Sequence, residues 1–187
     1  MTQTQYPRNA QVSIPKNAAL GLGHSSFLPH NAAVKLGLIS DTHGHVPNGV
    51  HEALAGVDHI LHAGDVGPMD VLTELEAIAP VSAVLGNTDH GIALPETRVE
   101  EFATHKFLIH HIVDASMPSQ RVRALLAEEQ PDVVVFGHTH IPFHEKIDGV
   151  LYLNPGSACQ PRDFSAAGVA IVDCAPTGLS VRFVPLT

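Results

Sequence analysis

Two histidines, His138 and His140, stand one residue apart at the end of an apolar run, in the stretch VVVFGHTH. In an extended chain, side chains two positions apart point to the same side, so both imidazoles would face one space. Histidine is the commonest metal ligand among the side chains. Taken alone, the pair fits a metal site and a pair of ordinary hydrogen-bonded histidines equally well.

Other side chains able to bind a metal follow the other apolar runs of the sequence. They are Asp41 and His43, then Asp65, then Asn87 and Asp89, then His110 and His111. Each has an ordinary alternative explanation as a turn residue, a helix cap or a packed histidine. However, the loops at the carboxyl ends of strands in an open α/β sheet converge in one crevice. The joint pattern therefore predicts one shared metal site.

The elements that must position these residues are short apolar runs, which we predict to be buried strands. The runs span residues 34–40, 59–64, 81–86, 106–111 and 132–137. Amphipathic stretches lie between them at 47–55, 68–79 and 118–130, and these predict helices. Strands that alternate with helices in this way are typical of an α/β domain with a largely buried sheet.

The pattern changes after Gly137. Short apolar runs follow at 143–147, 150–153, 167–173 and 179–185, and they are separated by the turn sequences Asp148-Gly149, Asn154-Pro155-Gly156 and Thr177-Gly178. Such turns between short runs predict β-hairpins and a second, more antiparallel sheet. We therefore expect an α/β protein with two sheets flanked by helices.

A chain of 187 residues suits one globular domain. Residues 1–33 mix Gln, Asn, Pro, Gly and Ser without a sustained period, and we predict that they form a poorly structured N-terminal extension. Residues 34–187 then form the domain. The two cysteines, Cys159 and Cys174, are widely spaced and form no CxxC motif, which indicates a reducing compartment.

The charge balance narrows the classes of partner. A formal net charge of −9 leaves no sequence-wide basic field for a nucleic-acid backbone or an anionic membrane. No apolar run is long enough to cross a bilayer, so we expect a cytoplasmic protein. A local cationic site stays open. Fourteen histidines, against ten lysines and arginines together, favour a metal site, although position and not count must decide.

The ordered series of these residues resembles the calcineurin-like metallophosphoesterases. The residues that carry the likeness are Asp41 and His43, Gly64-Asp65, Gly86-Asn87 with Asp89, His110, and Gly137-His138-Thr139-His140. The likeness is strongest to the small single-domain bacterial and archaeal phosphodiesterases, because Asn154-Pro155-Gly156-Ser157 occurs in their C-terminal part, and it runs from about residue 35 to the end. It implies a four-layer αββα sandwich of two mixed β-sheets flanked by helices.

The resemblance also implies a ligand set for two divalent metal ions. Asp41, His43 and His140 would bind one ion, Asn87, His110 and His138 would bind the other, and Asp65 would bridge them. This mixture of oxygen and nitrogen donors suits Mn, which we expect, and also Fe, Ni, Co or Zn. Within this set Asp65, Asn87 and His110 are expected to take part in catalysis, together with Asp89 as a group that orients His110 or a bound water.

Two departures from the family pattern concern the same site. Thr88 stands where many relatives have histidine or cysteine, so a side-chain general acid is not expected there. His111 stands where a glycine often follows the fourth-motif histidine, and it would either crowd the site or join it.

The function implied by the resemblance is hydrolysis of a phosphodiester by a hydroxide that bridges the two ions. We expect a small phosphorylated substrate, no stable nucleic-acid partner, no membrane, and possible pairing into a homo-oligomer. The alternative is a catalytically weak scaffold or protein-binding module on the same fold, as in the eukaryotic retromer subunit. All seven ligand positions of the family pattern are occupied by residues that can bind a metal, which favours the enzyme.

Overall fold

The computed structural model describes residues 32–187. The predicted extension, residues 1–33, lies outside the described residues except for its last two. The strands of the described part are β1 (Val34–Ile39), β2 (His59–His62), β3 (Val81–Ala83), β4 (Thr97–Phe102), β5 (His105–His110), β6 (Val133–Val135), β7 (Phe143–Ile147), β8 (Val150–Asn154), β9 (Gly168–Ala175) and β10 (Gly178–Pro185). The helices are α1 (Gly49–Ala53), α2 (Asp70–Glu76) and α3 (Gln120–Glu129).

The strands form two sheets, each with parallel and antiparallel neighbours. The first sheet has the order β10-β9-β1-β2-β3 and the second the order β4-β5-β6-β8-β7. In the first, β1, β2 and β3 run parallel while β9 and β10 are antiparallel additions. In the second, β5, β6 and β8 run parallel and β4 and β7 are antiparallel edges.

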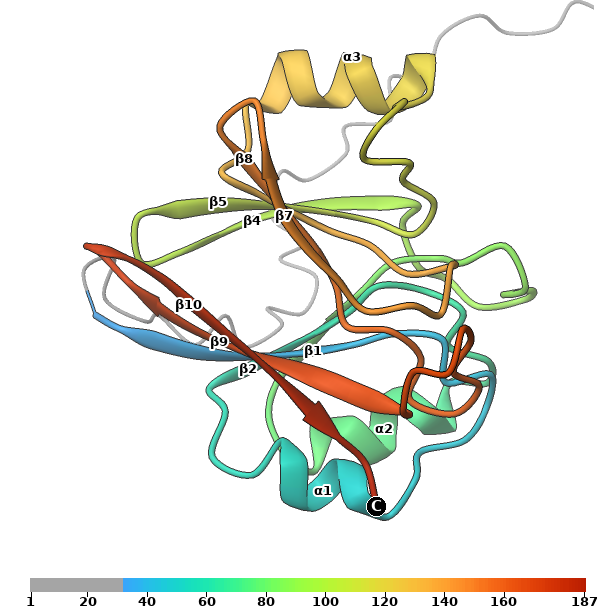
Figure 1. Cartoon of the computed structure of the whole chain (residues 1–187). Coiled ribbons are helices and arrows are strands. Elements are labelled where there is room, and N and C mark those ends of the chain that lie inside the picture. The colour runs from blue at the N-terminus through green and yellow to red at the C-terminus, as the bar shows by residue number, and fades with distance from the viewer. Residues whose placement is uncertain (1–31) are drawn as a thin grey trace, which may run out of the picture.

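The sheets stack face to face between helices. Figure 1 shows α1 and α2 beyond the outer face of the first sheet and α3 beyond the outer face of the second. This is the four-layer αββα arrangement with two mixed sheets, so the predicted fold class is confirmed. No helix among residues 32–187 has the length and apolar composition needed to span a bilayer.

Strand periodicity explains the three cores. Leu36 and Leu38 of β1 face the second sheet, and the apolar side chains between them and Phe107 and Ile109 of β5 form the central core. Ile39 lies out of phase with them and packs toward α1 and α2. On β5, the out-of-phase Leu108 packs in the core under α3.

The helices follow local signals in the sequence. The side chain of Ser119 accepts a hydrogen bond from Val122 N at 3.2 Å and caps α3. That helix ends at Gln130, whose left-handed backbone stops the helical bonds. All three predicted helical stretches contain the observed helices, which are shorter than the predicted ranges.

Strand β4 was not predicted. Its sequence TRVEEF is polar and mostly half-exposed, because it forms the edge of the second sheet and pairs with β5 alone. An edge strand carries little of the apolar pattern on which a strand prediction from sequence depends.

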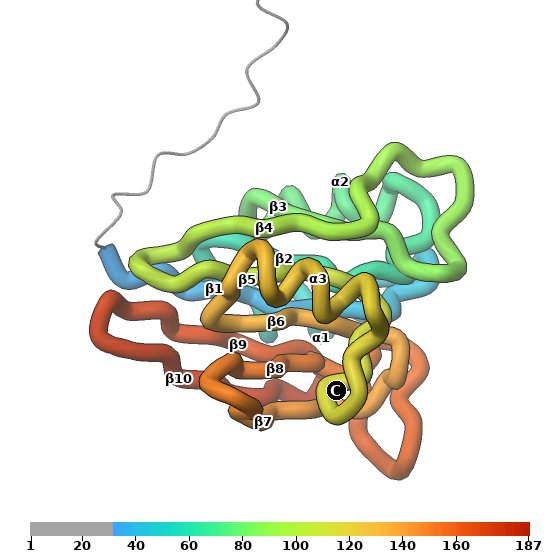
Figure 2. The backbone as a smooth tube through the Cα atoms, turned by 90° about the horizontal axis from the view of Figure 1, so that it is seen from above, coloured from blue at the N-terminus to red at the C-terminus, as the bar shows by residue number. Residues whose placement is uncertain are grey.

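The predicted convergence of loops is visible from above. In Figure 2 the turns that follow β1, β2, β3, β5 and β6 lie together at one end, whereas the β4–β5 and β9–β10 turns lie at the other. Backbone bonds tie these loops to each other: Asp41 N donates to Gly64 O at 3.0 Å, and Gly137 N donates to His111 O at 3.0 Å.

Candidate metal centre

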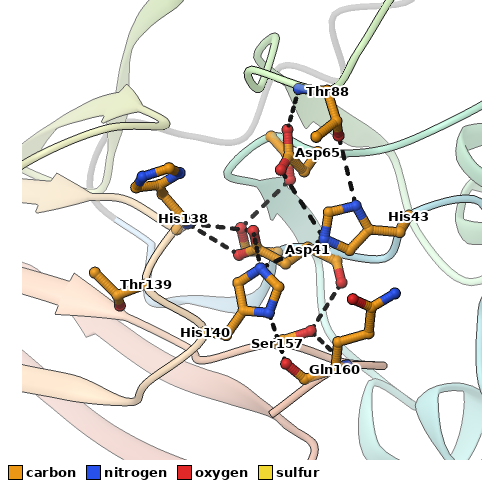
Figure 3. Close-up of polar contacts among 12 residues, drawn as sticks. Asp41, His43, Asp65, Thr88, His138, Thr139, His140, Ser157 and Gln160 are labelled. Atoms are coloured by element: carbon orange, nitrogen blue, oxygen red, sulfur yellow. Dashed lines mark hydrogen bonds and ion pairs between the residues drawn. The ribbon is translucent and has the colours of Figure 1, made fainter. Parts of the chain in front are cut away.

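One group of ligand atoms comes from the loops after β1 and β6. The Nε2 atoms of His43 and His140 lie 3.4 Å apart, and His140 Nε2 lies 3.2 Å from Asp41 Oδ1. Figure 3 shows these three side chains turned toward one another. One donor atom from each lies within 4.8 Å of the others, which is close enough for all three to contact one ion.

A second group comes from the loops after β3, β5 and β6. Asn87 Oδ1 lies 2.8 Å from His138 Nδ1 and 3.1 Å from His111 Nε2. An amide oxygen and two imidazole nitrogens that converge in this way are donors that suit a borderline divalent ion.

Asp65 lies between the two groups. Its Oδ2 atom is 3.4 Å from His111 Nε2 in the second group and 3.9 Å from His43 Nε2 in the first. Its Oδ1 atom accepts a hydrogen bond from Thr88 N at 2.9 Å. The carboxylate is buried and lies within 4 Å of a histidine of each group.

The structure places His111, and not His110, in the cluster. His110 Nδ1 lies 2.9 Å from Thr97 Oγ1 and 3.0 Å from the carbonyl oxygen of Glu96, on the side of β4. The reason is strand phase: His111 continues the inward series of Phe107 and Ile109, whereas His110 is out of phase with it. The expectation for His110 is corrected in this respect, and His111 joins the site instead of crowding it.

Asp89 has a different neighbourhood from the one expected. Its carboxylate accepts hydrogen bonds from three backbone N–H groups, those of Gly86, Gly67 and Val66, at 2.8, 2.8 and 3.1 Å. The expectation that Asp89 orients His110 is therefore wrong, because His110 bonds to Thr97 and Glu96 instead. Asp89 holds the loop after Asp65 against the turn that carries Asn87.

The ring orientation of two cluster histidines is fixed by main-chain carbonyls. His140 Nδ1 donates to Gln160 O at 2.6 Å, and His111 Nδ1 donates to Ala63 O at 2.7 Å. In the neutral rings this leaves each Nε2 with a lone pair. These lone pairs face the carboxylate oxygens of Asp41 and Asp65. Lone pairs that face one another repel unless a proton or a metal ion lies between them, so the residues present fit divalent metal ions.

The electrostatics of the carboxylates agree with this reading. Burial raises the pKa of Asp41 above its ordinary value, against the opposing effects of the Ser40 hydrogen bond and of the nearby imidazoles. Burial also opposes ionisation of Asp65, but the N–H of Thr88 and the neighbouring imidazole of His111 outweigh it and lower its pKa. Burial, followed by the charge of His111, lowers the pKa of His138. A positive ion in the cluster would favour the ionised carboxylates and neutral imidazoles.

The backbone of the cluster is strained. Asp41, His43, Asp65, His138 and His140 have φ values of 54°, 46°, 52°, 68° and 62°, in the left-handed region that few residues with a Cβ adopt, although aspartate and histidine adopt it more often than most. Such conformations persist only where the surroundings hold them, and they concentrate at functional sites.

Two glycines let the loops approach the carboxylates. A Cβ at Gly86 would lie 2.0 Å from Asp65 Oδ1, and a Cβ at Gly137 would lie 2.0 Å from Ser40 Oγ and 2.7 Å from Asp41 Oδ2. Any side chain at these positions would displace a cluster residue or its neighbour.

The sequence Asn154-Pro155-Gly156-Ser157 bonds to the loops that carry the ligands. Asn154 Nδ2 donates to the carbonyl of Gly137 at 2.8 Å, and Ser157 Oγ donates to the carbonyl of Asp41 at 2.9 Å. The interpretation of this stretch as a simple turn is therefore incomplete, because its polar side chains hold two ligand loops together.

His62 is a further residue that sequence reasoning did not identify. It is fully buried, its Nδ1 accepts a hydrogen bond from Gly64 N at 3.2 Å, and its Nε2 lies 2.9 Å from Thr42 Oγ1. Thr42 Oγ1 in turn lies 2.9 Å from Val66 O, to which it donates. This chain joins the loops of Asp41 and Asp65. The signal in the sequence was a histidine within a buried strand, three residues before Asp65.

Comparison with known proteins extends this description. A chain of Methanothermobacter thermautotrophicus named "Probable metallophosphoesterase" is 42% identical over 135 residues, which cover 68% of this chain and 78% of the relative. A phosphodiesterase of Methanocaldococcus jannaschii is 31% identical over 146 residues, covering 67% and 85%.

Among solved structures, the vacuolar protein sorting 29 protein of Entamoeba histolytica, complexed with zinc, superposes with a TM-score of 0.67. It is 21% identical, and the match covers 80% of this chain and 97% of the other, so it shows a shared fold. The family model for the calcineurin-like phosphoesterase superfamily domain matches residues 34–177. The chain therefore belongs to the calcineurin-like phosphoesterase superfamily.

Proposed function

We propose that this protein is a phosphodiesterase that uses two divalent metal ions. The observation that carries the proposal is the division of seven side chains into two donor groups that share one carboxylate. Asp41, His43 and His140 form the first group, Asn87, His111 and His138 form the second, and Asp65 lies between them.

The chain's own residues prepare this site for an anionic ester. The carbonyls of Ala63 and Gln160 keep His111 and His140 in the tautomer whose Nε2 faces the cluster. Two ions held there would supply Lewis acidity toward a phosphoryl oxygen and a water of lowered pKa. The ions would also offset the charges of Asp41 and Asp65, so an otherwise acidic protein would accept a phosphate.

Manganese is our first expectation for the metal, and iron, nickel, cobalt and zinc suit the same donors. The absence of thiolates among the donors and the presence of several imidazoles favour these ions over Ca²⁺ and Mg²⁺.

Thr88 limits the acid chemistry available to a leaving group. Its hydroxyl lies 3.5 Å from His43 Nδ1, and its N–H bonds to Asp65, so the residue borders the cluster. A hydroxyl is a far weaker acid than an imidazolium. We therefore expect small phosphodiesters with good leaving groups to react fastest.

Hydrolysis of bis(4-nitrophenyl) phosphate with added Mn²⁺ tests the proposal, together with metal content measured by mass spectrometry. The adjacent histidines provide a matched pair of variants. We expect His111→Ala to lose one bound ion and to lower turnover by more than about 100-fold, beyond the roughly 10–100-fold loss typical of residues that only support a ligand. His110→Ala is expected to retain both ions and most of the activity.

The outcome that contradicts the mechanism is equal metal content and equal turnover in wild type and in His111→Ala. A wild-type protein that binds two ions yet hydrolyses no phosphoester would instead favour a scaffold or binding module. The scaffold alternative is tested for this reason: the vacuolar protein sorting 29 protein has the same fold.

A further inference from the structure

The loop between Ser157 and Gly168 borders the cluster and is tied to it. Gln160 O accepts the hydrogen bond from His140 Nδ1 at 2.6 Å, and Arg162 N donates to His140 O at 3.4 Å. Ser157 Oγ also accepts hydrogen bonds from Cys159 N and Gln160 N. In Figure 2 the loop between β8 and β9 extends outward at the end of the molecule where the other site loops gather.

Within this loop, residues 162–165 form a tight turn. Ser165 N donates to Arg162 O at 3.0 Å, and the two central residues, Asp163 and Phe164, have φ values of 53° and 61°. Positive φ at both central positions defines a type I′ turn, in which glycine, asparagine and aspartate predominate. Aspartate therefore suits its position, whereas a bulky phenylalanine is a conformational outlier.

Phe164 contributes no packing that would explain its presence. Its relative exposure is 110%, the highest among the exposed large apolar residues of the described part of the chain. Most of the other exposed large apolar side chains of residues 32–187 also lie in loops at this end: Met69, Ile112 and Met117. A strained, fully exposed aromatic in a loop that is tied to a polar cluster is explained by a ligand better than by stability.

Arg162 supplies a positive charge at the same place. Within residues 32–187 its guanidinium makes no hydrogen bond or ion pair, whereas Arg98, Lys106 and Arg121 pair with glutamates. Among residues 32–187, Arg123 bonds to the carbonyl oxygen of Pro118, and the other cations without a side-chain partner, Lys35, Lys146 and Arg182, lie within strands. The backbone N–H of Arg162 donates to the carbonyl oxygen of His140 at 3.4 Å, so the residue borders the cluster.

We propose, on the basis of the phosphodiesterase function proposed above, that the turn of residues 162–165 recognises nucleoside phosphodiesters. Arg162 binds a phosphate oxygen, because a guanidinium with free donors matches that group. Phe164 stacks on the base of the ester, because an exposed aromatic ring offers a stacking surface to any base. The strained turn holds the ring outward, so little conformational freedom is lost when the base binds.

Two substrates with the same leaving group test the proposal: thymidine 5′-(4-nitrophenyl phosphate) and methyl 4-nitrophenyl phosphate. The variant is Phe164→Gly, which removes the ring from a position that favours glycine. We expect its KM for the thymidine ester to rise about 10-fold, within the range for loss of one base stack, with kcat retained. For the methyl ester KM should not change, and the melting temperature should not fall.

Asp163→Gly is the matched control, because it relaxes the other central position of the same turn and keeps the aromatic ring. We expect wild-type KM values from it on both substrates. Arg162→Gln should raise KM for both esters, since both carry the phosphate. As a readout independent of turnover, titration calorimetry with thymidine 5′-monophosphate should give binding weakened by about the same 10-fold in Phe164→Gly.

The failure of this inference differs from the failure of the proposed function. If wild type hydrolyses both esters and Phe164→Gly keeps the wild-type KM for the thymidine ester, the turn does not recognise the base. The proposed phosphodiesterase function is then unaffected. An equal rise in KM for both esters, or the same rise in Asp163→Gly, also overturns recognition by the turn. If wild type hydrolyses neither ester, the phosphodiesterase proposal itself fails.

Discussion

Acid should destabilise this protein through one buried histidine. His62 is fully buried, and the hydrogen bond it accepts from Gly64 N places its single proton on Nε2, next to Thr42 Oγ1. Burial lowers the pKa of His62 from 6.5 to about 3. The ring therefore stays neutral in the folded protein at pH values where it is charged in the unfolded chain.

The sign and size of the effect follow from proton linkage. Above pH 6.5 the ring is neutral in both states and does not change the free energy of unfolding. Between pH 6.5 and about 3 only the unfolded chain binds the proton, so stability falls by about 1.4 kcal/mol per pH unit as the pH decreases. The loss reaches about 3 kcal/mol at pH 4.5, a large part of the roughly 5–15 kcal/mol that stabilises a typical domain.

Urea unfolding of the EDTA-treated protein at pH 7 and pH 4.5 measures this loss. The comparison is with His62→Gln, whose amide donates to Thr42 but does not titrate in this range. We expect the variant to be less stable at pH 7, yet to lose about 3 kcal/mol less than wild type between the two pH values. Parallel losses, or a histidine NMR signal of His62 that titrates near pH 6, would refute the reasoning.

Three further predictions concern the support of the cluster. Gly137→Ala should destabilise the fold by about 1–3 kcal/mol and weaken metal binding, because its Cβ would lie 2.0 Å from Ser40 Oγ; thermal melts and metal titration check it. Asp89→Asn should cost about 2 kcal/mol of stability in urea, since a carboxylate that accepts three N–H bonds is replaced by an amide. Chelation with EDTA should lower the melting temperature of wild type more than that of His111→Ala, because ions that bind only the folded state stabilise it; equal shifts would contradict this.

Much of the fold and the clustering of the site could be predicted because both depend on local pattern. Strands β7 (Phe143–Ile147) and β8 (Val150–Asn154) begin where the apolar runs begin, on either side of the turn at Asp148-Gly149. The loops after five strands meet because parallel strands place their carboxyl ends at one edge. The pairing order of the strands was not predictable in this way, since it depends on contacts between distant segments.

The error at His110 and His111 shows which information was in the sequence and which was not. Phe107, Ile109 and His111 share one face of β5 and its extension, so the alternation of the strand favours His111 as the inward histidine. In the family pattern a glycine often follows the ligand histidine. The sequence was matched to that pattern with His110 as the ligand and His111 at the glycine position. Where a motif and strand phase disagree by one position, the phase decides which side chain faces the site, because a shift of one residue reverses every side chain.

The support of the site was harder to predict, since it depends on backbone groups that a sequence motif does not display. Asp89 binds backbone N–H groups of two loops, and Ser157 binds the carbonyl of Asp41. The carbonyls of Ala63 and Gln160 fix two imidazoles, and any residue at these positions offers the same carbonyl. Only the three-dimensional arrangement shows which main-chain groups reach the rings.

The fold explains the left-handed backbone at the cluster, but it does not explain which side chains stand there. The left-handed backbone at Asp41 and His43 is held by main-chain bonds, from Asp41 N to Gly64 O and from His43 N to Asp65 O, which any residue with an N–H makes. Stability alone would therefore favour glycine at both positions. Aspartate and histidine there cost conformational energy, and a bound cation or substrate would offset that cost. The same reasoning applies to Phe164, where the backbone favours glycine and the ring gains nothing from the fold.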